Sequence, residues 1–139
     1  MSVIVQPIGR FANKAEWELM DDWSVETPYG LLQINAGYLS DGASIPRFLW
    51  SLVGPRYAPD TFPAALAHDA LYSAHLPEVA DWRGAADAIF LDLLKRLGVG
   101  RAKRVAYYVA VRIFGWAVAR QHTNIGIEAA RKLVRMDTP

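Results

Sequence analysis

Hydrophobic and polar residues alternate along the first part of the chain, which is the pattern of half-buried β-strands. The alternation is clearest in Glu16–Leu19 and in Trp23–Glu26, and the polar pair Asp21-Asp22 separates the two segments. Thr27–Gly30 has the composition of a tight turn, so Leu31–Ile34 is expected to return as the next strand. This part of the chain therefore predicts a β-hairpin or a small antiparallel sheet.

The spacing of apolar residues becomes helical in the second half of the chain. Thr61 and Asp81 are good N-capping residues for two helices, the second of which is expected to end at Gly98. Two further helices are predicted over residues 101–121 and 125–135. Residues 101–121 are apolar on nearly every side, so they are expected to form the buried central helix.

These elements predict one α+β domain over residues 1–139. A chain of 139 residues with 53% hydrophobic content supports one core and is short for two. Residues 1–40 supply the β-hairpin region, and residues 41–60, which contain three prolines, supply a loop and a short helix. Residues 61–136 supply a bundle of three to four helices.

Composition and charge narrow the class of protein. The chain has no cysteine, which excludes a small secreted scaffold held by disulfides. Its net charge is +1, but residues 1–94 carry five basic and twelve acidic side chains, and residues 95–139 carry ten basic and two acidic ones. This asymmetry fits an anionic lipid, a nucleic acid or the protein's own acidic half as the partner of the basic part. Internal balance is the simplest explanation, and nucleic acid is not the expected partner.

No targeting or membrane-spanning segment is predicted. The start of the chain lacks the basic residues and the long apolar stretch of a signal peptide. The longest apolar run, residues 105–119, is interrupted by Arg112 and is shorter than the roughly 20 residues that span a bilayer. The protein is therefore expected to be soluble and to be made in the cytoplasm.

The first two long helices carry side chains typical of a catalytic site. His68 and Tyr72 are four positions apart and share one face of their helix, while Asp69 points toward a neighbouring surface. Asp87 falls in the apolar stripe of the next helix. If the two helices pack antiparallel, as their short connection favours, Asp87 approaches His68. Because an aspartate fixes the tautomer of a histidine and stabilises its charged form, His68 is predicted to act as a general base toward water.

Asp69 is predicted to bind a hard cation, for which Ca²⁺ is the candidate. Such an ion prefers oxygen ligands, and the loop at Asp41 and Gly42 offers a carboxylate and backbone carbonyls. Two structural interpretations stay open beside this one. Asp69 could instead cap the loop at residues 40–44 through its backbone N–H groups, and Asp-Gly alone is an ordinary turn.

Three segments of the chain resemble secreted phospholipase A2 enzymes. The segment His68–Tyr72 matches their His-Asp-x-x-Tyr motif, and Ala86-Asp87 followed by Phe90 is similar to the second helix of their prokaryotic members. The stretch from Asp41 to Ser44 is similar to their calcium loop. The resemblance implies a phospholipase A2-like helix pair. It also implies His68 as base, Asp87 as its orienting partner and Tyr72 as a supporting hydrogen-bond donor, with Asp69, Asp41 and the Gly42 carbonyl as calcium ligands.

Nearly the whole chain also resembles an uncharacterised protein family of tailed phages and prophages. The similarity lies in the N-terminal strands, in the Ser-Asp-Gly-Ala-Ser-Ile-Pro loop at residues 40–46 and in the His-Asp-x-Leu-Tyr helix. It continues in Arg83 with Ala86-Asp87, and in Ala110–Arg112. This resemblance implies a phage context without implying an activity.

The other candidate residues have structural interpretations too. His68 and Asp87 could be a buried polar pair that fixes helix register, and Tyr72 could be a core aromatic. Arg83 is expected to pair with Asp87 or Asp92 or to be a solvated charge, or else to contact the substrate. Next to the loop, the aromatic pair Phe48 and Trp50 either belongs to the core or lines the entrance for an apolar substrate.

Two classes of function therefore stay open. The first is a phage-derived, calcium-dependent hydrolase that acts on a lipid or another acyl ester. A variant of it uses the same site on the cell wall or on another host target. The second is a non-catalytic virion or tail protein that is made in the host cytoplasm, is incorporated into the particle and docks other phage proteins.

Overall fold

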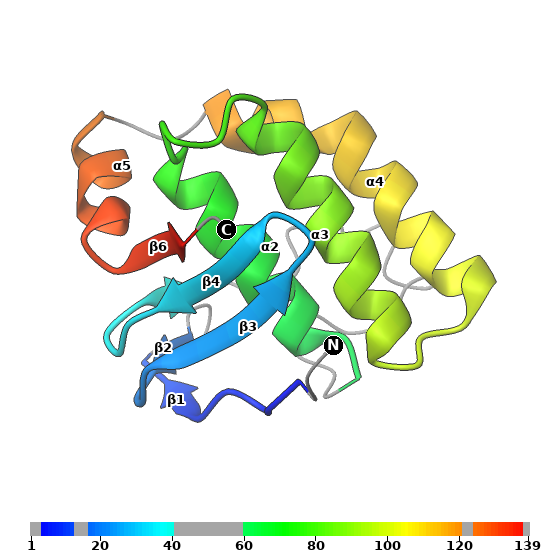
Figure 1. Ribbon diagram of the computed structural model, residues 1–139, viewed down its shortest axis with the longest axis horizontal. Helices are drawn as coiled ribbons and strands as arrows, with labels where there is room; N and C mark the ends of the chain where they lie inside the picture. Colours follow the sequence, from blue (N-terminus) through cyan, green and yellow to red (C-terminus); the bar gives the residue numbers. More distant parts are fainter. Residues whose placement is uncertain (1–3, 13–16, 41–59, 121–123, 138–139) are drawn as a thin grey trace.

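The computed structural model describes residues 4–12, 17–40, 60–120 and 124–137 (Figure 1). These residues form two three-stranded antiparallel sheets and four helices, which confirms the predicted α+β class. The strands are β1 (Gly9–Phe11), β2 (Trp17–Leu19), β3 (Trp23–Thr27), β4 (Gly30–Ile34), β5 (Leu39–Ser40) and β6 (Val134–Asp137). The helices are α2 (Phe62–Ala74), α3 (Trp82–Arg96), α4 (Arg101–Arg120) and α5 (Asn124–Arg131).

The predicted hairpin is present, but the strands before it belong to a separate sheet. β3 and β4 pair around a two-residue turn, with Thr27 opposite Gly30. Alternate residues of β3 are buried, as the sequence pattern predicted. β2 pairs instead with β1 and β5, so the N-terminal strands divide between two sheets.

The second sheet is completed by β6, where the sequence pattern predicted helix. The last helix ends at Arg131, and Val134–Asp137 pairs antiparallel with β4. The prediction of a helix over residues 125–135 is therefore wrong at its end, and residues 61–136 are not a purely helical bundle. Val134 and Met136 are buried while Arg135 and Asp137 are exposed, which is the period-two pattern of a strand.

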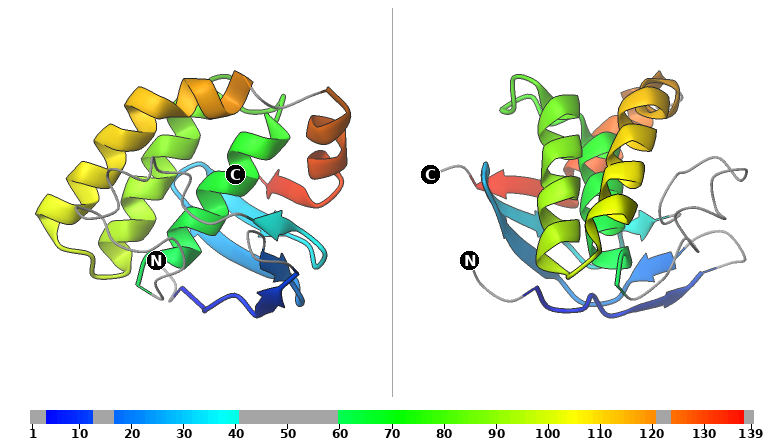
Figure 2. Two further views of the ribbon diagram at one scale, coloured as in Figure 1. Left: turned by 180° about the vertical axis from the view of Figure 1, so that it is seen from behind. Right: turned by 90° about the vertical axis from the view of Figure 1, so that its right-hand side faces the viewer.

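α5, α2 and α3 contact this second sheet, and α4 packs on α3, so the spatial order of the helices is α5, α2, α3, α4 (Figures 1 and 2). α2 lies between α5 and α3, and α4 lies at the outer end beside α3. Three residues on one face of α4 are exposed, namely Val105, Val109 and Ile113. The prediction that residues 101–121 form the buried central helix is therefore wrong for the described part, and α2 has that position. Among the described helices, none has both the length and the hydrophobicity that crossing a bilayer requires.

The core lies between the second sheet and α2. Four alanines of α2 are fully buried, which lets neighbouring elements approach its backbone closely: Ala64, Ala67, Ala70 and Ala74. Larger side chains from α3, α4 and the sheet fill the remaining space, among them Phe90, Tyr107 and Leu32. The close approach of α3 to α2 brings together the polar residues that the two helices carry.

Candidate active site

The ends of α2 and α3 set how the two helices face each other. The side chain of Asp81 accepts a hydrogen bond from the backbone N–H of Gly84 at 3.1 Å, which confirms Asp81 as the cap of α3. Thr61 occupies the N-cap position of α2, but its side chain makes no capping hydrogen bond. The other end of α2 stops at His75, whose left-handed φ of 44° turns the chain toward α3. The connection between the helices is therefore short and sharply turned.

His68 and Asp87 meet at the contact between α2 and α3. His68 Nε2 lies 2.7 Å from Asp87 Oδ1, and the Tyr72 hydroxyl donates to the same oxygen at 2.8 Å. The Asp87 side chain is fully buried, whereas that of His68 is 13% exposed. The structure thus places the three residues together as the helical spacing predicted, and leaves a small part of the His68 side chain exposed.

Two arginines complete this cluster. Arg112 from α4 donates to Asp87 Oδ2 at 2.9 Å, so both carboxylate oxygens are bonded. Arg83 donates to the Tyr72 hydroxyl at 3.1 Å and to the backbone carbonyl of Arg112 at 2.9 Å. The expected ion pair of Arg83 is replaced by these bonds, because Asp92 pairs with Arg96 one turn along α3 and Arg112 takes the second oxygen of Asp87.

The Asp87 carboxylate is stabilised in its charged form despite its burial. Burial by itself raises the pKa of Asp87, but hydrogen bonds and charge from His68, with hydrogen bonds from Tyr72 and Arg112, lower that pKa below its usual value. The hydrogen bond to Asp87 correspondingly raises the pKa of Arg112. An ionised carboxylate has no proton to donate, so His68 Nε2 is the donor in the 2.7 Å contact.

This arrangement defines the chemistry that His68 can perform. With the proton of a neutral imidazole held on Nε2, the lone pair is on Nδ1, and Nδ1 is the atom that can accept a proton from water. Asp87 stabilises the imidazolium that results. Tyr72 stays protonated, because burial raises its pKa to about 12 although the hydrogen bond from Arg83 acts in the opposite direction. Tyr72 is therefore a hydrogen-bond donor at neutral pH and cannot serve as the base.

Asp69 lies beside this cluster on α2 and is partly buried. Its backbone carbonyl accepts a hydrogen bond from the Ser73 hydroxyl at 2.8 Å, and Ser73 also contacts the Tyr38 hydroxyl at 2.9 Å. Within the described ranges, no three histidine, aspartate or glutamate side chains gather as metal ligands. Asp69 thus supplies one carboxylate of the kind Ca²⁺ prefers, and the other predicted ligands, at residues 41–42, lie outside the described ranges.

Four predicted site residues lie outside the described residues: Asp41, Gly42, Phe48 and Trp50. The calcium loop and the aromatic entrance therefore stay predictions. The same holds for the alternative in which Asp69 caps the loop at residues 40–44.

The sequence analysis missed Arg112 as a member of the cluster. It noted Arg112 as a charge that interrupts an apolar run and as part of the resemblance to the phage family, but gave it no partner. The available signal was that Arg112 is the one charged residue in the apolar run 105–119, on a helix that packs against α3. The fully buried Asp87 needs donors from neighbouring helices, but the sequence does not show which cation supplies them, and Arg112 is itself 43% exposed.

Comparison with known proteins assigns the chain to a family. A family model described as "Protein of unknown function (DUF1353)" matches residues 17–111, which include His68, Tyr72, Arg83 and Asp87. No curated protein matches the chain. No solved structure matches it either. Since the family model covers more than half of the sequence, this protein belongs to the DUF1353 family.

Proposed function

We propose that this protein is a hydrolase of acyl esters in which His68 activates water. The observation that carries the proposal is the 2.7 Å contact between His68 Nε2 and the buried, ionised Asp87. The His68 side chain is 13% exposed. When neutral, it carries its proton on Nε2 and a lone pair on Nδ1, as a general base requires. The resemblance to phospholipase A2 supports an ester of a lipid as the substrate class.

The reaction begins with proton transfer from water to His68 Nδ1. The hydroxide attacks the acyl carbon, and the bond from that carbon to the leaving oxygen breaks. The imidazolium, stabilised by Asp87, then returns its proton to the leaving oxygen, so that a carboxylic acid and an alcohol are released. Tyr72 and Arg112 hold Asp87 in place by bonds of 2.8 and 2.9 Å during this cycle.

A calcium ion is part of this proposal. Asp69 would hold it together with Asp41 and the Gly42 carbonyl, and the bound ion would polarise the ester carbonyl and stabilise the negative oxygen. The donor chemistry of Asp69 fits such an ion. Hydrolysis is therefore expected to stop when a chelator removes calcium and to return when calcium is added.

The test measures hydrolysis of phospholipid vesicles and of p-nitrophenyl butyrate, with calcium and with chelator. His68→Asn should lower the rate by roughly 10²- to 10⁴-fold, since it removes the general base. His75→Asn is the matched control, because asparagine tolerates the left-handed φ of 44° at that position. A wild-type protein inactive on both esters, or a His68→Asn variant with full activity, contradicts the proposal.

A second function is favoured by the hydrogen bonds that both carboxylate oxygens of Asp87 accept. Asp87 has no exposed surface and is bonded by residues of α2 and α4, so the same residues can serve to lock three helices together. In that function the protein is a phage virion or tail component that is made in the host cytoplasm and binds neighbouring phage proteins. It predicts that His68→Asn lowers the melting temperature and particle assembly while no ester is hydrolysed by any variant.

A further inference from the structure

The edge of β6 that faces away from β4 is open in the described part of the chain. β6 has a single neighbour, β4, in the order β3-β4-β6. The N–H of Asn35 donates to the carbonyl of Leu133 at 2.7 Å, so this opposed pair is a hydrogen-bonded one. Hydrogen-bonded pairs alternate along an antiparallel ladder, so Arg135 and Asp137 also bond to β4. The backbone N–H and C=O groups of Val134 and Met136 therefore point away from the sheet.

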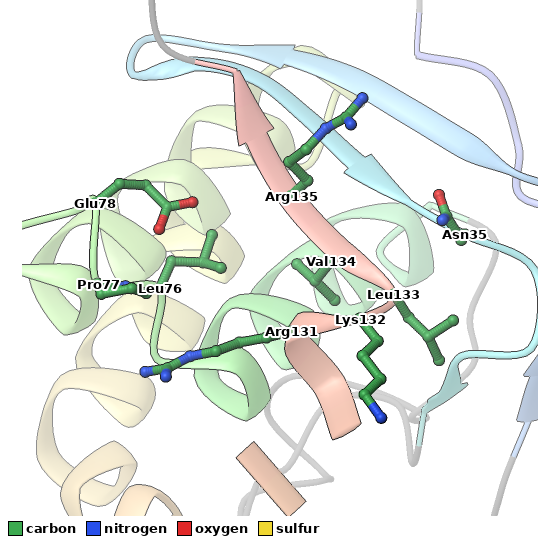
Figure 3. A pocket seen from close by; sticks show the side chains of 9 residues that line it. All are labelled: Asn35, Leu76, Pro77, Glu78, Arg131, Lys132, Leu133, Val134 and Arg135. Carbon is green, nitrogen blue, oxygen red and sulfur yellow. The ribbon is translucent and has the colours of Figure 1, made fainter. Parts of the chain in front are cut away.

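A groove runs along this open edge. One pocket, of about 320 Å³, lies between the loop residues Leu76–Glu78 and the segment Arg131–Arg135 (Figure 3). A second pocket, of about 260 Å³, continues from Glu78 along Val79–Ala80 to Tyr29 in the turn between β3 and β4. Figure 3 shows the Glu78 side chain pointing from the loop toward β6. The two pockets share Glu78 and none of the residues of the His68 cluster.

The side chains around the groove specify what fits in it. Opposite β6 the first pocket is lined by the apolar Leu76 and Pro77, and the second pocket, which no residue of β6 lines, adds Val79 and Ala80 beside the acidic Asp81. The solvent face of β6 presents Arg135 paired with Asp137 at 3.3 Å, and the exposed Lys132 lies just before the strand. The first pocket has three basic side chains against one acidic one, Glu78. An added strand would therefore place apolar side chains inward beside Val134 and Met136, and an acidic side chain outward near Lys132.

We propose that this groove binds an extended segment of another protein as a fourth strand of the sheet, with alternating apolar and acidic residues. The backbone groups of Val134 and Met136 supply the hydrogen bonds, as in other cases of strand addition to a sheet edge. The apolar side chains of the wall and the cation of Lys132 supply the selectivity. The site is independent of the proposed hydrolysis, because it lies on different elements from His68.

The test uses a blocked hexapeptide of alternating valine and glutamate, with a valine–lysine hexapeptide of equal length as control. Binding is followed by amide hydrogen exchange and by NMR chemical shifts. The amides of Val134 and Met136 should become protected when the glutamate peptide is added, whereas that of Arg135, already bonded to β4, should change little. The lysine peptide should bind more weakly.

Charge variants make the test specific to the groove. Lys132→Glu should weaken binding of the glutamate peptide by roughly two- to fivefold, and Glu78→Lys should strengthen it by a similar factor. Arg101→Glu is the matched control, since Arg101 is exposed on α4 and lines neither pocket. Equal binding of both peptides, or protection of no β6 amide, overturns the proposal. A peptide-free dimer in which Val134 and Met136 are already protected overturns it in favour of a second copy of the chain.

Discussion

At the scale of single residues, Asp87 connects the parts of the candidate site. It is a fully buried carboxylate, and its two oxygens are bonded by side chains of α2 and α4. The contact with His68 could be predicted, because the spacing of both residues on their helices and the short connection between the helices were visible in the sequence. The contribution of Arg112 could not, because it depends on how the third long helix packs.

The first prediction concerns the charge of Asp87. Asp87→Asn keeps the shape of the side chain but leaves one acceptor oxygen for donors that now bond both oxygens, so at least one hydrogen bond is lost and the free energy of unfolding is expected to fall by about 1.5–3 kcal/mol. Asp92→Asn on the same helix is the control. Asp92 bonds only the adjacent Arg96 among the contacts seen for its side chain in the described residues, so its replacement should cost less than about 1 kcal/mol. Urea denaturation measures both, and equal costs would show that Asp87 is not specially stabilised.

The second prediction concerns pH. The pKa of Asp87 is lowered in the folded protein, because the bonds from His68, Tyr72 and Arg112 outweigh the effect of burial. The unfolded chain therefore binds this proton more readily, and the stabilisation is present above the ordinary aspartate pKa of about 3.9 and is lost as the pH falls below it. The unfolding free energy of the wild type should decrease more steeply between pH 5 and about 3 than that of Asp87→Asn. Parallel pH profiles of the two proteins would contradict this expectation.

At the scale of elements, the strongest sequence patterns predicted the structure best. The alternation in β3, the turn before β4 and the Asp81 cap of α3 are local features, and all three are present. β6 was taken for the end of a helix because Arg131, Lys132 and Arg135 have helical spacing. Its strand conformation depends on pairing with β4, which lies far away in the sequence, so tertiary structure overrides local spacing here.

A third prediction tests whether residues 134–137 form a strand with one buried face, by comparing substitutions at two adjacent residues. Met136 is 5% exposed and faces the core, whereas Arg135 faces solvent. Met136→Ala should therefore lower the free energy of unfolding by about 2–5 kcal/mol. Arg135→Ala should change it by no more than about 0.5 kcal/mol. Chemical denaturation of the two variants measures the difference, and comparable costs would be incompatible with a strand that has one buried face.

At the scale of the whole molecule, the second sheet includes a strand that lies outside the residues matched by the family model. The DUF1353 model matches residues 17–111, which include β3 and β4 but not β6. Leu32 and Ile34 of β4 are fully buried, and the residues of β6 that lie opposite them, Met136 and Val134, belong to the same buried core. The part of the chain beyond the family match is therefore needed to complete the core of the part within it.

A fourth prediction follows for a shortened chain. Ending the protein at Leu133 removes the buried Val134 and Met136, each of which contributes about 1.5–3 kcal/mol through burial. This loss is a large fraction of the 5–15 kcal/mol that typically stabilises a domain. The shortened protein should melt at a markedly lower temperature, as followed by circular dichroism. A chain ending at Asp137 is the control, and identical melting of the two would show that β6 is dispensable.

The pairing of β4 with β6 also bears on how the protein folds during translation. Gln33 and Asp137, whose side chains bond across this pair, are 104 positions apart. The β3–β4 hairpin leaves the ribosome long before its third strand has been synthesised. Contacts between such distant segments form slowly, and an uncovered strand edge invites pairing with other nascent chains. Chaperones that shield the hairpin during this interval should therefore raise the yield of correctly folded protein.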